Sequence, residues 1–141
     1  MQITFTVPEV RGKGRPRFFR GHAVTDSATR NYETLIANLS SRAMKSAGIN
    51  QPFESSVHVD MTAFFQIPKS YSKKKVQQCL AGVLRPGKPD ADNIVKAVLD
   101  GMNKIVYLDD KQVYDFHIEK KYSDIEYGVR VTVRSADDQV D

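Results

Sequence analysis

The stretch KPDADNIVKAVLDG, residues 88–101, combines the clearest helix pattern in the chain with two closely spaced aspartates. Pro89 disfavours helical geometry at the residue before it, so we expect a helix from about Ala91 to Asn103 with Asp90 at its N-cap. At about 100° per residue its apolar side chains share one arc, formed by Ile94, Val95, Val98, Leu99 and Met102. This arc predicts a helix that packs against another layer of the domain.

Strand patterns lie on both sides of this helix in the sequence. Residues 2–7 alternate apolar and polar side chains, and residues 55–67 are rich in β-branched and aromatic side chains. Two further strand candidates, residues 112–122 and 126–134, follow the helix. These four segments are enough for one sheet.

Two more helices are expected between the first strand and the central helix. One runs from about Thr29 to Ala47 and ends at Gly48. Its predicted core-facing residues recur every four positions, at Leu35, Leu39, Ala43 and Ala47, with Ile36 and Met44 beside them. The other is short, with Ser72 as its N-cap and Gly82 as its stop.

The resulting order β-α-β-α-α-β-β predicts the α/β (mixed α+β) class, with helices packed on a mixed β-sheet. A length of 141 residues, with 40% hydrophobic and 27% charged residues, suits one soluble domain with a buried core. We expect that domain to span residues 1–134. Residues 135–141 form an acidic tail that we expect to be disordered.

Several classes of protein are disfavoured by composition. Cys79 is the single cysteine, so the chain forms no internal disulfide, and with three scattered histidines it is a poor candidate for a structural zinc site. No apolar run approaches the length needed to span a bilayer, and the N-terminus lacks the pattern of a signal peptide. We expect a cytoplasmic protein with no membrane partner.

The positive charge is concentrated in two segments. RGKGRPRFFR, residues 11–20, contains no acidic residue and indicates a loop or hairpin, and PKSYSKKK, residues 68–75, is also basic. Basic surfaces with interleaved aromatic side chains favour a nucleic acid as partner. The candidate DNA contacts are Arg11, Lys13, Arg15, Arg17, Phe18, Arg20, Lys73, Lys74 and Lys75.

The two aspartates of the opening stretch allow two interpretations. In the first, Asp90 caps the helix, the helix dipole stabilises the negative charge of Asp92 in the first turn, and Asp100 is a solvated helix residue. Alternatively, Asp90 and Asp92 converge because Asp90 lies outside the helix. A second acidic pair, Asp109 and Asp110, follows an apolar run shortly afterwards.

A cluster of these carboxylates would need a cation to offset their repulsion. Oxygen ligands of this kind suit Mg²⁺ or Mn²⁺. Lys96, one turn after Asp92, would lie on the same side as the cluster, where it could stabilise charge on a reacting phosphate. Carboxylate-bound metal beside a basic surface predicts a metal-dependent nuclease.

The composite KPDADNIVKAVLDGMNKIVYLDDKQV, residues 88–113, resembles the signature of the RusA family of Holliday junction resolvases. The resemblance extends to GRPRF near the N-terminus and to TRNYE at the start of the first long helix. It implies a RusA-like domain in which Asp90, Asp92 and Asp110 bind Mg²⁺ and are catalytic, with Lys96 as the essential lysine. Asp109 is implied as a residue of the second coordination shell or of the turn.

The same resemblance implies a homodimer that cuts branched DNA, the four-way junction, by paired incisions. A C₂ dimer presents two equivalent sites to two related strands. Many relatives are encoded by phages or prophages. One type of this family has a highly basic stretch directly before the first catalytic aspartate. This chain has RPGK at that place, so the resemblance does not say which residues contact the junction arms.

Two other functions remain open from the sequence. One is a nuclease of the same chemistry that acts on forks or flaps. The other is a non-catalytic basic DNA-binding protein, which would bind DNA without Mg²⁺ and tolerate Asp92→Asn.

Overall fold

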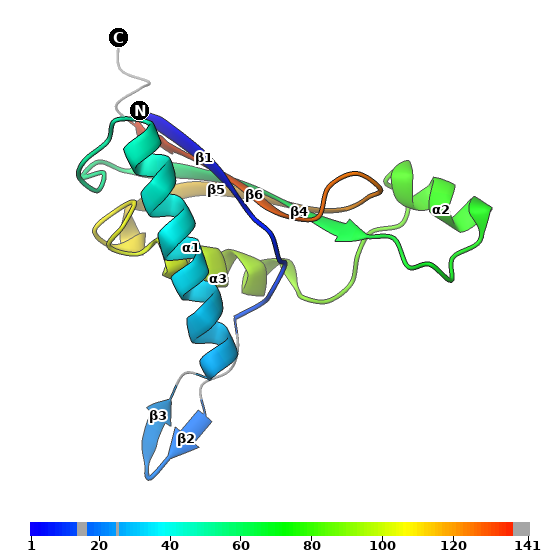
Figure 1. Ribbon diagram of the computed structural model, residues 1–141, viewed down its shortest axis with the longest axis horizontal. Helices are drawn as coiled ribbons and strands as arrows, with labels where there is room; N and C mark the ends of the chain where they lie inside the picture. The colour runs from blue at the N-terminus through cyan, green and yellow to red at the C-terminus, as the bar shows by residue number, and fades with distance from the viewer. Residues whose placement is uncertain (14–16, 25, 137–141) are drawn as a thin grey trace.

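The computed structural model describes residues 1–13, 17–24 and 26–136, with the backbone alone for residues 17–19 and 22–24. It confirms the mixed α+β class. A four-stranded sheet has the order β1-β6-β4-β5, and the helices α1 and α3 pack beside each other against it (Figure 1). The buried side chains of the sheet and both helices form one core.

The four expected strands are present. β1 (Gln2–Val7) pairs antiparallel with β6 (Gly128–Ser135), which pairs antiparallel with β4 (Val57–Gln66). β5 (Val113–Ser123) lies at the edge of the sheet and runs parallel to β4, so the sheet is mixed, as predicted. Alternate residues of β1, β4 and β6 are buried because one face of the sheet is covered by helices.

The end of β6 lies slightly beyond the expected domain boundary. Ser135 is still in the strand, and the Ala136 amide donates a 2.8 Å hydrogen bond to the Ser56 carbonyl. Of the predicted acidic tail, residues 137–141 lie outside the described part of the chain. Disorder of that segment stays a prediction.

The first long helix, α1 (Ser27–Ser46), begins two residues earlier than expected, with Asp26 as its N-cap. Two of the apolar residues expected along it, Ile36 and Met44, are buried, but the expected line at four-residue spacing lies to one side of the core. The buried residues are Thr29, Tyr32, Ile36, Ser40 and Met44, while Leu35, Leu39 and Ala43 are only partly buried. α1 contacts both β1 and α3, so its core-facing side points between the sheet and that helix.

The helix of the opening stretch, α3 (Ala91–Met102), has the predicted bounds and the predicted arc, of which only Leu99 is partly exposed. It packs closely on α1. A Cβ placed on Gly101 would lie 2.6 Å from the Cβ atom of Ile36, so glycine permits this approach.

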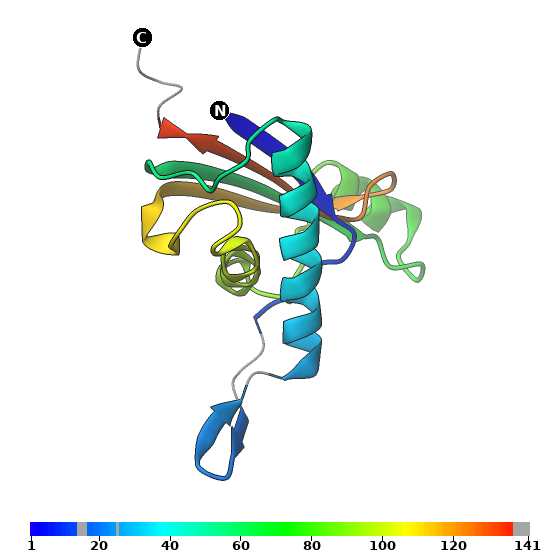
Figure 2. The ribbon, with the colours of Figure 1, turned by 60° about the vertical axis from the view of Figure 1, so that its left-hand side comes forward.

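Two elements that carry parts of the basic segments project from the body at separate places. β2 (Arg17–Phe19) and β3 (His22–Val24) form a hairpin, a separate two-stranded sheet beyond the N-terminal end of α1 (Figures 1 and 2). Its turn, Arg20 and Gly21, has positive φ at both residues, as in a tight hairpin turn. The short helix α2 (Lys73–Leu80) lies beyond the end of the sheet away from the termini (Figure 1).

α2 follows the sequence prediction closely. The Ser72 hydroxyl accepts a hydrogen bond from the Lys75 amide, and Gly82 has the positive φ expected after a helix. Cys79 is the buried residue of this helix. In the described part of the chain, no helix combines the length and apolarity needed to cross a bilayer.

Candidate active site

Asp90 stands at the N-cap of α3 in the extended conformation, with φ −64° and ψ 151°. Its main-chain carbonyl accepts the first helical hydrogen bond, from the Ile94 amide. Its carboxylate makes no capping hydrogen bond, so the capping interpretation was wrong for this side chain. The helix end therefore does not engage the Asp90 carboxylate.

Contacts to the edge strand hold the loop before Asp90. Lys120 on β5 donates from Nζ to the carbonyl oxygens of Gly87 and Pro89, at 2.5 and 3.1 Å. Arg85 donates to the Lys120 carbonyl at 3.1 Å and to the Glu119 carboxylate at 3.0 Å. These bonds fix the start of α3 against β5.

A cavity of about 460 Å³ lies between α3, the segment after it and β5. Its polar lining consists of Asp92, Lys96, Asp100 and Asp110. Its apolar lining consists of Val95, Leu99, Phe116 and Ile118. The cavity thus brings Asp110 of the second acidic pair beside Asp92, Lys96 and Asp100 of α3. Asp90, which the second interpretation placed with Asp92, does not line it.

Asp90 faces a neighbouring hollow rather than this cavity. That hollow is lined by Gly12, Lys13, Lys88, Pro89, Asp90 and Asn93. Gly12 lies close to the start of α3, because a Cβ there would be 3.0 Å from the Pro89 Cβ and 3.1 Å from the Asn93 Cβ. The segment before the hairpin therefore runs past the two aspartates.

The second acidic pair sits in a turn that leads into a 3₁₀ helix, η1 (Asp110–Gln112). The Asp109 carboxylate accepts a 2.9 Å hydrogen bond from the Lys111 amide, so Asp109 has the turn role that the sequence left open. Gln112 completes a capping box by accepting from the Asp109 amide at 3.0 Å. The side-chain Nε2 of Gln112 donates to the main-chain carbonyls of Phe53 and Ser55, so the turn is held against the segment before β4.

Negative charge accumulates where this turn meets α3. Partial burial raises the pKa of Asp110, the hydrogen bond and charge of Asp109 raise it further, and Asp100 adds to the effect, while Lys96 opposes it. The pKa of Asp109 is lowered, chiefly by the Lys111 amide. A cation in the cavity would relieve the repulsion at Asp110.

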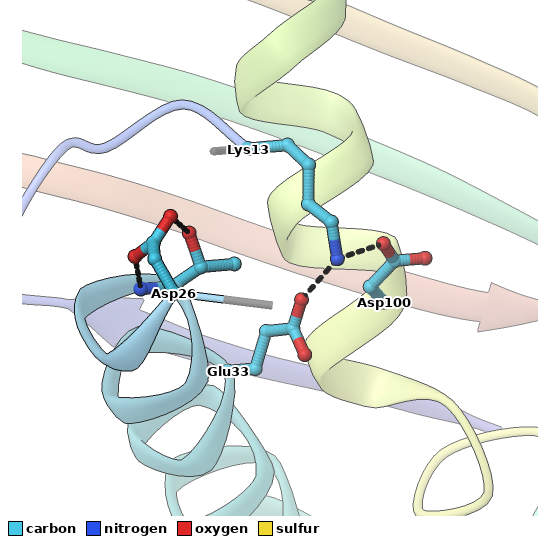
Figure 3. A network of polar contacts seen from close by, with 5 residues as sticks. Lys13, Asp26, Glu33 and Asp100 are labelled. Atoms are coloured by element: carbon cyan, nitrogen blue, oxygen red, sulfur yellow. Dashed lines mark hydrogen bonds and ion pairs between the residues drawn. The ribbon is translucent and has the colours of Figure 1, made fainter. Parts of the chain in front are cut away.

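Lys13 makes two partly buried ionic contacts near the site (Figure 3). Its ammonium lies 2.5 Å from Glu33 Oε1 on α1 and 2.9 Å from Asp100 Oδ2 on α3. The interpretation of Asp100 as a solvated helix residue was wrong, because only 29% of its side chain is exposed. Lys13, expected as a DNA contact, has its charge engaged by two carboxylates.

The donor set is compatible with a hard divalent cation. Asp92 and Asp110 present carboxylates to one cavity, and Mg²⁺ commonly takes one or two carboxylates together with water and substrate phosphate. Among the residues that the structure describes, no three acidic, His or Cys side chains gather closely enough to enclose an ion. Metal binding by Asp90, Asp92 and Asp110 stays a prediction.

Comparison with known proteins decides the family. The family model described as Endodeoxyribonuclease RusA matches residues 8–134. The chain belongs to the RusA endodeoxyribonuclease family. A relative from Bacillus subtilis (strain 168), named uncharacterized protein YqaN, is 35% identical over 140 residues, covering 94% of this chain and 95% of the relative.

Among the other predicted DNA contacts of this RusA-family protein, Arg20 and the lysines of α2 lie on projecting elements. Arg11 is half exposed and pairs with Glu9 at 2.7 Å. Arg20 is at the exposed hairpin turn, and the exposed residues Lys73, Lys74 and Lys75 are on α2, where Lys75 lies 4.1 Å from the ring centre of Tyr71. Arg15 lies outside the described residues, and of Arg17 and Phe18 only the backbone in β2 is described.

Sequence reasoning missed several residues of this RusA-family site. Glu33 binds the ammonium of Lys13, which is 20 residues away in the sequence. Lys120 donates to the carbonyl of Pro89, which is 31 residues away, so neither contact could be read from neighbouring residues. Phe116 and Ile118 line the cavity from β5, where their positions pair in register with the buried residues Val59 and Met61. The alternation of residues 112–122 could have placed them on the helix-covered face, had the neighbouring strand been known.

Proposed function

We propose that this protein is a divalent-metal-dependent endonuclease that resolves four-way DNA junctions by paired phosphodiester hydrolysis. Membership of the RusA endodeoxyribonuclease family supports the nuclease activity. The observation that carries the chemistry is the cavity shared by Asp92, Lys96 and Asp110, which groups carboxylates and a cationic side chain as metal-assisted hydrolysis requires.

In this proposal, Asp92 on α3 and Asp110 on the following turn hold Mg²⁺ or Mn²⁺ in the cavity that they share. Asp90 lines the neighbouring hollow and its carboxylate makes no capping bond, so it would complete the ligand set by turning towards the ion from the start of α3. The bound cation supplies Lewis acidity at the scissile phosphate and lowers the pKa of water. The carboxylates would orient the ion, and Leu99, Phe116 and Ile118 form an apolar wall beside it.

Lys96 acts at the reacting phosphate. It is one turn beyond Asp92 on the same stripe of α3, and its charge acts on Asp110 across the cavity. An ammonium held there stabilises negative charge that develops on the phosphate oxygens in the transition state. Its backbone is fixed because the opposite side of α3 is packed in the core, so the main chain need not move when DNA binds.

Recognition of the substrate is assigned to the projecting basic segments. The hairpin with Arg17, Phe18 and Arg20, together with Arg11 and Arg15, contacts one part of the DNA, and the lysines of α2 contact another. Their contribution is mainly sequence-independent and salt-dependent. A homodimer with C₂ symmetry would place two such sites on the two strands of a junction.

The test is cleavage of an end-labelled synthetic four-way junction with Mg²⁺, with Mn²⁺ and with EDTA. Linear duplex, fork and flap substrates run beside it. We expect paired, symmetric incisions of the junction that need the metal. Preferential cutting of forks or flaps would show that the four-way junction is not the preferred substrate, while it would still support metal-dependent hydrolysis.

Asp92→Asn is the diagnostic variant and Asp124→Asn its matched control, since Asp124 is exposed in the turn between β5 and β6. Asp92→Asn should abolish incision but still shift the junction in a gel, whereas Asp124→Asn should behave as the wild type. Binding without incision in Mg²⁺ and in Mn²⁺ by the wild type would instead indicate a non-catalytic DNA-binding protein.

A further inference from the structure

Lys13 is attached to the proposed metal-binding helix at two places. Its main-chain amide donates a 3.1 Å hydrogen bond to the Asn93 carbonyl, directly after Asp92. Its ammonium reaches Asp100, two turns further along α3, at 2.9 Å, and also contacts Glu33 on α1 (Figure 3). Lys13 therefore lies along the helix that supplies most of the residues lining the cavity.

These contacts are shielded from solvent. The exposed side-chain fractions are 20% for Lys13, 25% for Glu33 and 29% for Asp100. The Arg11–Glu9 pair in the same segment is 53% and 48% exposed, so water and salt screen it far more. Burial alone would lower the pKa of Lys13, but its hydrogen bonds to Glu33 and Asp100 outweigh burial and raise it, so the ammonium keeps its charge.

Of the carboxylates that line the cavity, that of Asp100 is already paired with the ammonium of Lys13. Asp92 and Asp110 line the same cavity, and within the described part of the chain neither forms an ion pair of this kind with a cationic side chain. We propose that Lys13 is a positioning residue that keeps Asp100 out of the metal-binding set, so that within this cavity the ion is held by Asp92 and Asp110, with Asp90 as the remaining ligand. This inference rests on the proposed function of the site.

Loss of the Lys13 charge would change the cavity in a defined way. Asp100 would lose its partner and offer a further carboxylate beside Asp110, and the affinity of a carboxylate site for a divalent cation rises with the number of charged ligands. The ion would then be displaced along α3 towards Asp100. Binding of free metal should tighten while cleavage of DNA falls.

The first test is titration of the DNA-free protein with Mn²⁺, followed by electron paramagnetic resonance of the unbound ion. Lys13→Met should bind Mn²⁺ about tenfold more tightly than the wild type. Adding Asp100→Asn to Lys13→Met should return the affinity to the wild-type value. Unchanged Mn²⁺ affinity in a folded Lys13→Met protein would overturn the inference, whatever its cleavage rate.

Asp100→Asn alone keeps the test decisive if Lys13→Met does not fold. Because Asp100 is already outside the metal set, this variant should keep the wild-type Mn²⁺ affinity. A clear loss of Mn²⁺ binding would make Asp100 a ligand and overturn the assignment to Lys13.

Junction cleavage gives the second readout. Lys13→Met should cut at least about tenfold more slowly than the wild type, and Lys13→Met with Asp100→Asn should recover part of the rate. Arg42→Met removes one exposed positive charge from α1, away from the cavity, and should keep the wild-type Mn²⁺ affinity and cleavage rate. If the wild type itself fails to cut, the proposed function fails, whereas normal cutting by Lys13→Met with unchanged Mn²⁺ affinity defeats only this inference.

Discussion

The hydroxyl of Tyr107 donates a 2.5 Å hydrogen bond to the main-chain carbonyl of Leu99, and the Tyr107 side chain is fully buried. Leu99 is in the last turn of α3, which carries Asp92 and Lys96, while Tyr107 immediately precedes the turn that carries Asp110. This one bond therefore joins the two halves of the proposed metal site.

Tyr107→Phe should reduce both stability and activity. The Leu99 carbonyl would lose its buried partner, which costs about 1–3 kcal/mol of unfolding free energy. We expect a lower urea midpoint and slower junction cleavage, because the turn with Asp110 is less firmly held to α3. Tyr114→Phe is the control, since Tyr114 is 53% exposed, and an equal loss in the two variants would contradict this account.

Gly101→Ala should destabilise the protein although alanine is the better helix former. Helix propensity alone favours alanine by about 1 kcal/mol. The added Cβ would meet the Ile36 Cβ at 2.6 Å and its Cγ2 at 2.7 Å, and such overpacking costs about 1–3 kcal/mol. Thermal unfolding should show a net decrease in Tm. Gly87→Ala, with no atom within 4 Å, should cause no comparable loss, and a Tm increase for Gly101→Ala would refute the close packing of α1 on α3.

Stability should fall in alkaline solution as buried tyrosines ionise on unfolding. Burial raises the pKa of Tyr32 from 10.0 to about 12, and it also raises the pKa of Tyr107. Between the unfolded and the folded pKa, the unfolded chain loses the phenolic proton and the folded protein keeps it, so the unfolding free energy decreases as pH rises. The slope approaches about 1.4 kcal/mol per pH unit for each tyrosine.

Urea unfolding measured at pH 9, 10 and 11 checks this slope. Tyr32→Phe should lower stability at neutral pH, because the Tyr32 hydroxyl donates to the Glu9 carbonyl at 2.6 Å. It should also flatten the alkaline decline, since one titrating group is removed. An identical slope in the variant and the wild type would show that Tyr32 does not contribute.

Neutralising the α2 lysines should weaken junction binding without slowing the chemical step. Lys73→Gln with Lys74→Gln removes two charges from an exposed helix away from the cavity. The slope of log affinity against log salt should decrease by about 0.9 for each phosphate that is no longer neutralised. Cleavage under saturating protein should be unchanged. Arg42→Gln with Lys45→Gln, two exposed charges near the end of α1, is the matched control and should leave the slope as it is.

Local sequence patterns predicted the features that depend on residues close together in the chain. The bounds of α3, the extended geometry of Asp90 and the tight turn at Asp109 follow from neighbouring residues. The glycine and basic content of residues 11–20 predicted a loop or a hairpin, and the structure has a hairpin formed by β2 and β3. The Lys13–Asp100 contact could not be predicted in this way, because it depends on how a distant segment lies along α3.

The buried side of α1 shows the same limit. A four-residue spacing fits two adjacent lines on a helix, and only the position of α3 selects the line through Ile36 over the line through Leu35. The Asp90 side chain is a different case. Its residue type and position suit a cap, yet its carboxylate forms no cap bond, and this deviation from the local preference falls at the proposed site.

The hairpin β2–β3 is a sheet of its own, and it meets the body where Lys13 bonds to α3 and where Asp26 caps α1. Its two strands pair with each other and not with the four-stranded sheet, so its sequence can drift without disturbing the pairing of that sheet. Selection can therefore act on it almost independently of the carboxylates. If the hairpin contacts DNA as proposed, relatives can change their DNA contacts while they keep the carboxylates of the proposed metal site.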